Sequence, residues 1–421
     1  TSVDEVVAAA RRLRVEEAVA ADPSVRNSVE EIVSDVAARG DAALDHWVAV
    51  HDSDSSGAAV REVDPAVTTR ALAELDPSLV DALTLSIANA RVVAGRVADR
   101  SGERITVRPG QIITSKPLPV EVAAVYVPGG RNPFPSSLIM GVTAAHGAGV
   151  DRVVACARPE PESGEIHPAI LATAALLKVK LFRMGGAHAI AAFAFGTETV
   201  PKADVIVGPG NEYVVEAKRQ VLGKVGIDSL AGPSELVVVL SEAVPAVALD
   251  LAAQAEHGPS SPVIALSTSS EILDQLEREL DEVDAPRTER PVRLIKAPDY
   301  EACAAFANAY APEHLQLAGA EAEALVGQIR AAGCVFVGAA AGTAFGDYVA
   351  GSNHVLPTAG AARYSSALSP LTFTRQQEIV EISCDAASKL ADAGATIAQA
   401  EGFPLHRDSM LARKQEKQAD D

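Results

Sequence analysis

From about residue 120 onward, short apolar runs alternate with stretches of helical periodicity, and this alternation limits the possible folds more than any other feature. Apolar runs of this length are typical of strands that are buried on both faces of a sheet. They lie at 120–127, 150–155, 179–184, 205–207, 236–240, 263–266 and 334–337. Helical patterns separate the first four runs, at 136–146, 168–177 and 187–195. The alternation predicts an α/β fold of parallel sheets with helices on their faces.

The runs form two sets, which predicts two α/β units, with the first unit either inserted between parts of the second or leading into it. The expected divisions are 1–118, 119–231, 232–365 and 366–421. Amphipathic spacing at 28–39 and 77–99 predicts a helical opening segment, and the final 55 residues are expected to be helices and a tail, with 378–392 the clearest helix. The polar stretches 51–57 and 277–290 are expected to be loops.

The charge balance excludes several classes of partner. The chain carries 36 basic and 56 acidic residues, for a formal net charge of −20. A nucleic-acid polymer needs a basic surface to neutralise its phosphates, and an anionic membrane attracts basic segments, so both partners are disfavoured. The sequence has no apolar run of about 18 residues and no recognisable targeting signal. We therefore expect neither nucleic-acid nor membrane binding.

The cysteines point to a reducing environment. The four cysteines are scattered without a CxxC pair, so neither a disulfide framework nor a thiolate zinc site is predicted. Scattered cysteines without disulfide spacing are typical of cytoplasmic proteins. Cys303 and Cys334 lie in apolar runs, where a structural role is favoured over a reactive thiol. Ser234 lacks the G-x-S-x-G pattern of a nucleophile elbow, which argues against a serine nucleophile.

Glycine-rich turns follow three of the predicted strands in the first unit. They are VPGG at 127–130, MGGAH at 184–188 and GPGN at 208–211. Such turns let backbone N–H groups approach a phosphate at the carboxyl ends of strands, and a helix start favours the anion. Each turn alone is better explained by the conformational demands of a strand-to-helix turn. Three in one unit favour a nucleotide site, although the GxGxxG fingerprint is absent.

Histidine and carboxylate recur together at four places. These are AQAEHGP at 253–259, YAPEHL at 310–315, GDYVAGSNH at 346–354 and EGFPLH at 401–406. Imidazole nitrogen and carboxylate oxygen are usual zinc ligands. A single histidine is more often structural, but four pairings among nine histidines favour a metal or acid–base site. Gln254 and His257 share one face of a helix end, where residue chemistry alone would choose Glu256 rather than Gln254 as a ligand.

These motifs resemble those of the histidinol dehydrogenase family. The segments that carry the resemblance are VYVPGG, VGPGNEYVVEAKRQ, VGIDSLAGPSEL, AAQAEHG, YAPEHL, GDYVAGSNHVLPT and EG followed by LH. The resemblance covers most of the chain from about residue 105 to 410, with weaker agreement before that. The resemblance implies two incomplete Rossmann-like units arranged as in aldehyde dehydrogenases, with a helical N-terminal segment and a C-terminal tail. The unit at 119–231 would then bind NAD, and 232–365 would carry the zinc and substrate site.

The resemblance also implies the reaction and its cofactors. A family member would use Zn²⁺ and two NAD to oxidise L-histidinol through the aldehyde to L-histidine, a step of histidine biosynthesis. The implied zinc ligands, which also contact substrate, are Gln254, His257, Asp347 and His406. Glu313 and His314 would be the acid–base pair, with His314 taking the alcohol proton and Glu313 activating water.

The remaining implied contacts extend to cofactor and partner. Ser234, His354 and Glu401 would contact substrate together with the zinc ligands and His314. Glu401 and His406 lie in the tail, which would reach a partner subunit's site, so a homodimer is implied. Tyr126, His188 and Asn211 would contact NAD. His188 departs from the glutamine that is usual in the family, and its imidazole can still donate or accept one hydrogen bond.

Three alternatives remain open at this stage. A relative could apply the same mechanism to another small alcohol, such as a sulfonated propanediol. A zinc hydrolase could use Glu313 to activate water without a nucleotide. A degenerate paralogue could bind ligand without catalysis.

Overall fold

The computed structural model describes residues 2–16, 22–52, 61–97, 101–129, 132–258, 260–283 and 292–414. The chain divides into two compact units. The first unit comprises Thr1–Val97 and Val120–Phe373, and the second comprises Ala98–Pro119 and Thr374–Asp421. In the described parts of the chain, no helix is long and apolar enough to cross a membrane.

The first unit contains two parallel five-stranded sheets. The earlier sheet has the strand order β5-β4-β3-β6-β7. Its strands are β3 (Val122–Val127), β4 (Arg152–Ala157), β5 (Lys180–Arg183), β6 (Val205–Val207) and β7 (Gly226–Ile227). Its connecting helices are α6 (Pro135–Ala148), α7 (Pro168–Leu177), α8 (Gly186–Phe195) and α9 (Glu212–Val221). The chain winds outward from β3 in one direction and then from β6 in the other, which leaves a crevice beyond the carboxyl ends of these two strands.

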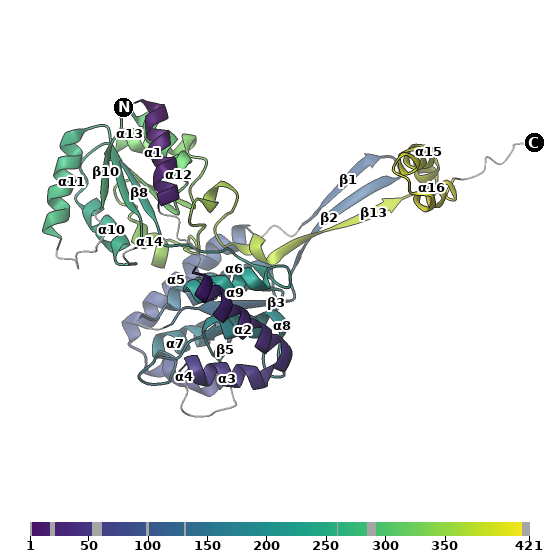
Figure 1. Ribbon diagram of the computed structural model, residues 1–421, viewed down its shortest axis with the longest axis horizontal. Helices are drawn as coiled ribbons and strands as arrows, with labels where there is room; N and C mark the ends of the chain where they lie inside the picture. Colours follow the sequence, from purple (N-terminus) through teal and green to yellow (C-terminus); the bar gives the residue numbers. More distant parts are fainter. Residues whose placement is uncertain are drawn as a thin grey trace, which may run out of the picture. The chain divides into compact units, whose positions relative to one another are not determined.

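Helices from the first hundred residues complete the layers over this sheet (Figure 1). On one face α2 (Pro23–Arg39) and α3 (Asp41–His51) share an apolar core with α8 and α9. On the other face α5 (Pro77–Val97) packs beside α6, and α4 (Pro65–Glu74) packs against α7. Every residue of β3 is buried as a result, which explains its continuous apolar run.

The later sheet of the first unit has the order β10-β9-β8-β11-β12 and is also parallel. Its strands are β8 (Leu236–Leu240), β9 (Val263–Ser267), β10 (Arg293–Lys296), β11 (His314–Ala318) and β12 (Cys334–Val337). The helices are α10 (Ala246–Ala255), α11 (Ser270–Glu282), α12 (Tyr300–Tyr310), α13 (Ala320–Glu323) and α14 (Thr343–Tyr348), with 3₁₀ turns η1 (Ala324–Gln328), η2 (Ala361–Arg363) and η3 (Pro370–Phe373). The first helix of the chain, α1 (Val3–Glu16), packs on α12 and adds Val6 and Ala10 to this core.

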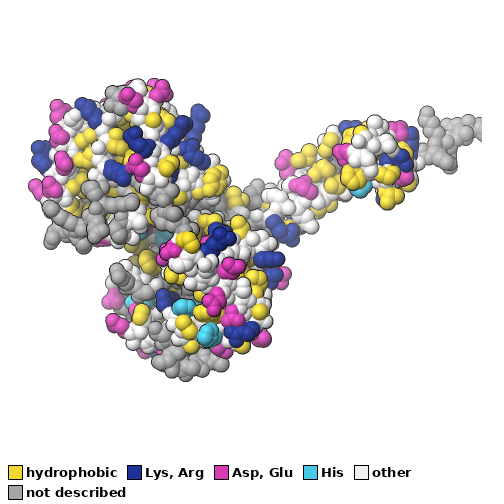
Figure 2. Space-filling model, in the orientation of Figure 1, with side chains coloured by type: hydrophobic (Ala, Val, Ile, Leu, Met, Phe, Trp, Pro, Cys, Tyr) yellow, Lys and Arg dark blue, Asp and Glu magenta, His cyan; other side chains and the backbone are white. Residues whose placement is uncertain are grey.

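The second unit is an antiparallel three-stranded sheet with two helices. Its strand order is β1-β2-β13, with β1 (Glu103–Arg108), β2 (Gln111–Pro119) and β13 (Thr374–Ile382). At the end of its long ribbon, α15 (Cys384–Ala400) and α16 (Pro404–Leu411) pack on each other (Figure 1). Apolar side chains lie exposed along the strands and over the helices (Figure 2), and they include Ile105, Val107, Ile379, Val380, Ile382, Ile397, Phe403 and Leu405. Exposed apolar surface of this extent is typical of an interaction site.

The structure confirms the α/β class and most of the predicted elements in the first unit. The runs 205–207, 236–240 and 334–337 are β6, β8 and β12, and the helical pattern 168–177 is α7. The other four predicted strands and two predicted helices occur with shifts of one or two residues. Sequence patterns missed β7, β10 and β11, which are short or carry polar residues. The four-part division of the chain stays a prediction.

Three expectations about local structure were wrong. Residues 378–382 belong to β13, so the predicted helix at 378–392 begins only at Cys384, and the sequence patterns also missed β1 and β2. β13 pairs with β2, which lies far earlier in the chain, and local spacing cannot reveal that pairing. Residues 277–282 continue α11, which buries Leu273 and Leu276 beneath a charged face. His51 ends α3, while 53–57 and 284–290 lie outside the described residues.

Candidate active site

A cavity of about 310 Å³ in the first unit is lined by six of the predicted site residues. Glu313 and His314 stand at the start of β11, and Ser234 lies just before β8, so the later sheet contributes the amino ends of its strands. The earlier sheet contributes the turns after the carboxyl ends of β3 and β6. The predicted site residues that line the cavity are Ser234, His257, Glu313, His314, Asp347 and His354.

A chain of hydrogen bonds joins Gln254 to Glu313 through Ser234. Gln254 Nε2 donates to Ser234 Oγ over 2.8 Å, and Ser234 Oγ donates to Glu313 Oε2 over 2.6 Å. Gln254 and Glu313 are both buried. The amide of Gln254 therefore uses a donor toward Ser234, which leaves its oxygen as the atom suited to a cation.

His314 has a defined ring orientation beside two carboxylates. Its Nδ1 lies 3.0 Å from the Glu235 carbonyl oxygen and 3.3 Å from Glu313 Oε2, while Nε2 lies 3.9 Å from Asp347 Oδ1. Donation from Nδ1 leaves Nε2 as the ring's proton acceptor in the neutral form. Burial lowers the pKa of His314, but the hydrogen bond and charge of Glu313 and the charge of Asp347 outweigh it and raise the pKa to about 9.

Asp347 and His354 also line the cavity. Asp347 lies on α14, and burial raises the pKa of its carboxyl although the charges of His314, His354 and His257 oppose this shift. His354 Nδ1 donates to the Asp347 carbonyl oxygen over 2.8 Å, and its Nε2 lies 3.3 Å from Ser137 Oγ. Burial lowers the pKa of His354, which favours a neutral imidazole that can hydrogen-bond without adding charge.

The predicted metal ligands are only partly brought together. His257 and Asp347 line the cavity, and Gln254 reaches it through Ser234. Among the described residues, no three His, Cys, Asp or Glu side chains are arranged to hold a metal ion. Glu401 caps the end of α15 and His406 lies on α16, so both belong to the second unit. His406 is exposed, with its ring 5.3 Å from that of Phe403.

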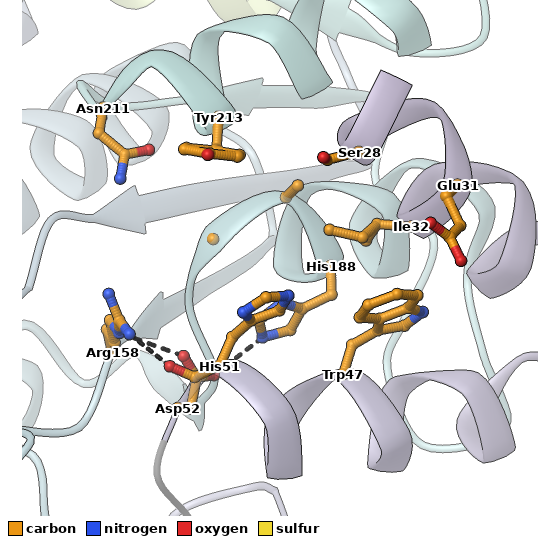
Figure 3. A pocket seen from close by; sticks show the side chains of 12 residues that line it. Ser28, Glu31, Ile32, Trp47, His51, Asp52, Arg158, His188, Asn211 and Tyr213 are labelled. Carbon is orange, nitrogen blue, oxygen red and sulfur yellow. Dashed lines mark hydrogen bonds and ion pairs between the residues drawn. The ribbon is translucent and has the colours of Figure 1, made fainter. Parts of the chain in front are cut away.

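A second cavity of about 400 Å³ lies over α3, α8 and α9 in the first unit (Figure 3). His188 and Asn211 line it, as do Trp47, His51 and Arg158. The Trp47 and His51 rings stack with centroids 5.6 Å apart, and His51 stacks in turn on His188 at 6.1 Å. Asn211 and Tyr213 face this stack from the other side of the cavity. We call this cavity the α3–α8 pocket.

Asp52 organises the floor of the α3–α8 pocket. Its Oδ2 lies 2.8 Å from His188 Nε2 and accepts the Gly185 N–H over 2.9 Å, while Arg158 Nε lies 3.3 Å from Oδ1. Burial raises the pKa of Asp52, but His188, the Gly185 N–H and Arg158 more than offset this and lower it. His188 Nδ1 is buried without a hydrogen-bond partner among the described residues. The imidazole therefore keeps one polar atom available to a ligand.

Sequence reasoning missed most of the residues that line this pocket, among them Trp47, His51, Asp52 and Arg158. The four-residue spacing of Trp47 and His51 places them on one helix face, which was the available local signal. The predicted contact Tyr126 is itself buried in β3, and its hydroxyl accepts the Gly186 N–H over 3.1 Å. Nearby, Gly208 has a φ of +116°, and a Cβ there would lie 2.0 Å from the Tyr126 carbonyl oxygen. The first GPGN glycine is thus needed for close backbone packing.

None of the four cysteines lines either of these two cavities. All four are free, with Cys156 and Cys303 buried. Burial raises the pKa of Cys303 to about 12 and that of Cys334 to about 11. Because the thiolate is the reactive form, these side chains are poor nucleophiles near neutral pH.

The sequence profile of the histidinol dehydrogenase family matches residues 15–414. The chain belongs to the histidinol dehydrogenase family. Histidinol dehydrogenase from Synechococcus sp. is 40% identical over 402 residues, which are 92% of each chain. That of Thermus thermophilus is 40% identical over 404 residues, covering 93% of this chain and 95% of the relative. The crystal structure of histidinol dehydrogenase from Elizabethkingia anophelis superposes with a TM-score of 0.88 at 33% identity, covering 94% of this chain and 93% of that one.

These comparisons confirm the resemblance that the sequence motifs indicated. Similarity extends over both units, including the second unit that carries Glu401 and His406. Membership in the histidinol dehydrogenase family makes the chain an oxidoreductase. The α/β arrangement is likewise that of a solved histidinol dehydrogenase.

Proposed function

We propose that the enzyme oxidises L-histidinol to L-histidine in two successive hydride transfers to NAD, with the aldehyde as intermediate and with bound Zn²⁺. The reaction would serve histidine biosynthesis in the cytoplasm. The observation that carries the proposal is the buried Glu313–His314 pair, which lies in one cavity with Ser234, His257 and Asp347. Family membership and relatives named histidinol dehydrogenase support it.

In the first oxidation His314 acts as the base. A hydride leaves the alcohol carbon for NAD, and the hydroxyl proton passes to His314 Nε2. The hydrogen bond from Nδ1 to the Glu235 carbonyl supports this assignment, because it keeps Nε2 unprotonated in the neutral ring. The ring must first be neutral, so the acidic surroundings that raise its pKa oppose the base role until a positive charge offsets them.

In the second oxidation Glu313 acts as the base toward water. It takes a proton as water adds to the aldehyde. The resulting hydrate anion then loses its hydride to a second NAD, and the acid so formed releases its remaining proton to solvent to give the carboxylate. Glu313 Oε2 already accepts from Ser234 Oγ and from the Glu235 N–H over 2.8 Å. These two donors hold the carboxylate in place, so its orientation is set before water arrives.

The zinc ion would be held by Gln254, His257, Asp347 and His406 of the partner subunit. Two imidazole nitrogens and two oxygens fit zinc, and the raised pKa of Asp347 reflects a buried carboxylate that a cation would stabilise. When bound, the metal supplies a fixed point that orients the substrate's nitrogen atoms. Neutralising Asp347 also removes one charge that raises the pKa of His314.

Gln254→Ala is expected to weaken zinc affinity by about 10- to 100-fold, since one oxygen ligand is lost. The measurement is the zinc content of purified enzyme equilibrated in buffers of fixed free zinc concentration. Gln275→Ala, which changes a glutamine on α11, is the matched control and should retain the parent's zinc content. Equal zinc affinity of Gln254→Ala and the control would remove Gln254 from the ligand set.

NAD would occupy the α3–α8 pocket and extend toward the reaction cavity along the carboxyl ends of β3 and β6. The Trp47–His51–His188 stack offers a surface for a planar base, and the Arg158 guanidinium offers positive charge for phosphate. His188 Nδ1 and Asn211 offer polar contacts to NAD. Tyr126 would contribute indirectly, because its hydroxyl accepts the Gly186 N–H and so fixes the backbone of the turn.

His188→Ala is expected to weaken NAD binding by about tenfold, because a hydrogen-bonding atom and part of the stack are removed. Trp47 is the single tryptophan of the chain and lines the pocket, so its fluorescence reports binding directly. His46→Ala is the control, since His46 contacts the Trp47 ring edge-on at 4.9 Å but does not line the pocket. Unchanged affinity in His188→Ala, or no NAD response in the parent, would argue against this location.

The active enzyme would be a homodimer whose tails complete each other's sites. The exposed apolar side chains of the second unit support an intersubunit role for it. Mixing His406→Ala subunits with His314→Asn subunits should therefore restore activity, since one site of each mixed dimer has both intact residues. Random exchange gives half mixed dimers, so roughly a quarter of parent activity is expected. Mixtures that stay as inactive as either variant alone would indicate that each site uses residues of one chain only.

The overall proposal is tested by the stoichiometry of the reaction. Zinc-loaded enzyme with limiting histidinol should form two NADH and one histidine per histidinol. No turnover at high enzyme concentration would overturn the substrate assignment. A panel of small alcohols, including sulfonated propanediols, tests whether the same residues act on another substrate, and ester cleavage without NAD binding would indicate a hydrolase instead.

A further inference from the structure

Arg14 reaches from the N-terminal helix α1 to a buried carboxylate beside the reaction cavity. Its Nη1 donates to Glu235 Oε1, and its Nη2 lies 2.9 Å from Glu235 Oε2. The same guanidinium donates to the Tyr310 carbonyl oxygen from Nε and Nη2, over 3.1 and 2.8 Å, and its carbon lies 3.7 Å from the Tyr310 ring centroid. Arg14 is thus held in one orientation by contacts to the last residue of α12 and to the residue just before β8.

Glu235 is the residue that touches both members of the proposed acid–base pair. Its N–H donates to Glu313 Oε2 over 2.8 Å, and its carbonyl oxygen accepts from His314 Nδ1 over 3.0 Å and from the His314 N–H over 3.2 Å. Its own carboxylate accepts the Ala359 N–H over 2.9 Å and the Glu313 N–H over 3.4 Å. The orientation of Glu313 and the ring tautomer of His314 therefore both depend on where the Glu235 backbone lies.

The Glu235 carboxylate needs a cation to remain in this position. Its side chain is only 3% exposed, and burial raises its pKa while Arg14 opposes that shift. An ionised carboxylate left in such a site without its cation is strongly unfavourable. Without Arg14 the side chain would rotate toward water or take up a proton, and either change would disturb its contacts with Ala359 and Glu313.

We propose that Arg14 is a positioning residue for the Glu313–His314 pair and acts through Glu235. The inference rests on the catalytic roles proposed above for that pair. It assigns a function in catalysis to α1, a helix that none of the sequence motifs singled out. The docking of α1 has a separate basis, because Val6 and Ala10 are buried in the core shared with α12. Removing the guanidinium should therefore affect the pair without detaching the helix.

Arg14→Met keeps an apolar stem over Tyr310 and removes the charge. We expect kcat to fall roughly 10- to 100-fold, because the reacting groups are misplaced by a fraction of an ångström to an ångström. The KM for histidinol, zinc content and NAD affinity should stay within about twofold of the parent, since those depend on other residues. Arg14→Lys restores the charge but not the two-pronged contact, and should recover part of the lost kcat.

Arg12→Met is the matched control, because Arg12 is an exposed residue of the same helix. It should leave kcat unchanged. Glu235→Gln should lower kcat as Arg14→Met does, and the double variant should be no worse than the more affected single variant, since both act through one contact. An Arg14→Met enzyme with the parent's kcat would overturn the proposal. So would a fall in kcat that is matched by equal falls in zinc content and thermal stability. Multiplicative losses of kcat in the double variant would also overturn it.

Crystal structures of the parent and Arg14→Met separate this inference from the proposed function. The expected difference is a lengthened contact between His314 Nδ1 and the Glu235 carbonyl oxygen, and an unchanged contact overturns the inference. This comparison needs no turnover. If the parent oxidises no alcohol, the proposed function fails, while the crystal structures still decide whether Arg14 positions the pair. If Arg14→Met does not fold, the same comparison is made with Arg14→Lys and Glu235→Gln.

Discussion

His314→Asn is expected to lower kcat for histidinol by about 10²- to 10⁴-fold, the range associated with loss of a general base. The asparagine amide can still donate to the Glu235 carbonyl oxygen, so local packing changes little, but no basic nitrogen remains. Zinc content and NAD affinity should match those of the parent. Initial rates of NADH formation, atomic absorption for zinc and Trp47 fluorescence measure the three quantities.

The same assignment has a pH signature. The base must be neutral, so kcat should rise with pH as His314 loses its proton, and this rising limb should be absent in His314→Asn. The pKa of about 9 reflects uncompensated carboxylates, and a cation next to Asp347 should move the limb to lower pH. His146→Asn, which changes an exposed histidine on α6, is the control for both measurements. A variant at His314 as active as this control would exclude His314 as the base.

Glu313→Gln is expected to stop the second oxidation more severely than the first. Glutamine keeps the acceptor oxygen for Ser234 Oγ and the Glu235 N–H but cannot take a proton from water. Formation of histidine should slow by about 10²- to 10⁴-fold. The yield of NADH should fall from two toward one per histidinol when released aldehyde is trapped with semicarbazide.

The control for this variant is Glu321→Gln, at an exposed glutamate on α13. It should form two NADH per histidinol at the parent's rate. Equal losses at both oxidation stages in Glu313→Gln would assign Glu313 to binding or positioning, because a residue that serves only the water step affects only that stage. Parent rates at both stages would exclude it from the mechanism.

The sequence motifs alone do not show which contacts His314 and Glu313 make, and the choice of His314→Asn and Glu313→Gln depends on those contacts. The YAPEHL segment stands out in the sequence by its adjacent carboxylate and imidazole, but its residue pattern does not predict the start of a strand. In the structure β11 starts at His314 and lies between β8 and β12. This placement brings Glu235, from 78 positions earlier, against Glu313. A short strand with polar residues at its start lacks the continuous apolar run that identified β8 and β12.

The α3–α8 pocket illustrates the same limit. His188 was identifiable because it lies in a glycine-rich turn after a predicted strand, whereas Asp52 and Arg158 carried no motif. Asp52 ends a helix of the opening segment and contacts His188, which is 136 positions away. Nothing in local periodicity predicts such a contact. Only the folded structure shows that Asp52 is buried and that its carboxylate contacts His188.

Residue type and spacing were enough to predict parallel α/β layers, because continuous apolar runs between helical patterns are typical of strands that are buried on both faces of a sheet. They also indicated the family and the candidate residues for acid–base and metal chemistry. The folded chain was needed to show that the later sheet presents the amino ends of β8 and β11 to the cavity, that β1, β2 and β13 form a separate sheet, and that Arg14 contacts Glu235. The pairing of β13 with β2 and the ion pair of Arg14 with Glu235 join groups that are distant in the chain, whereas sequence patterns report local preferences.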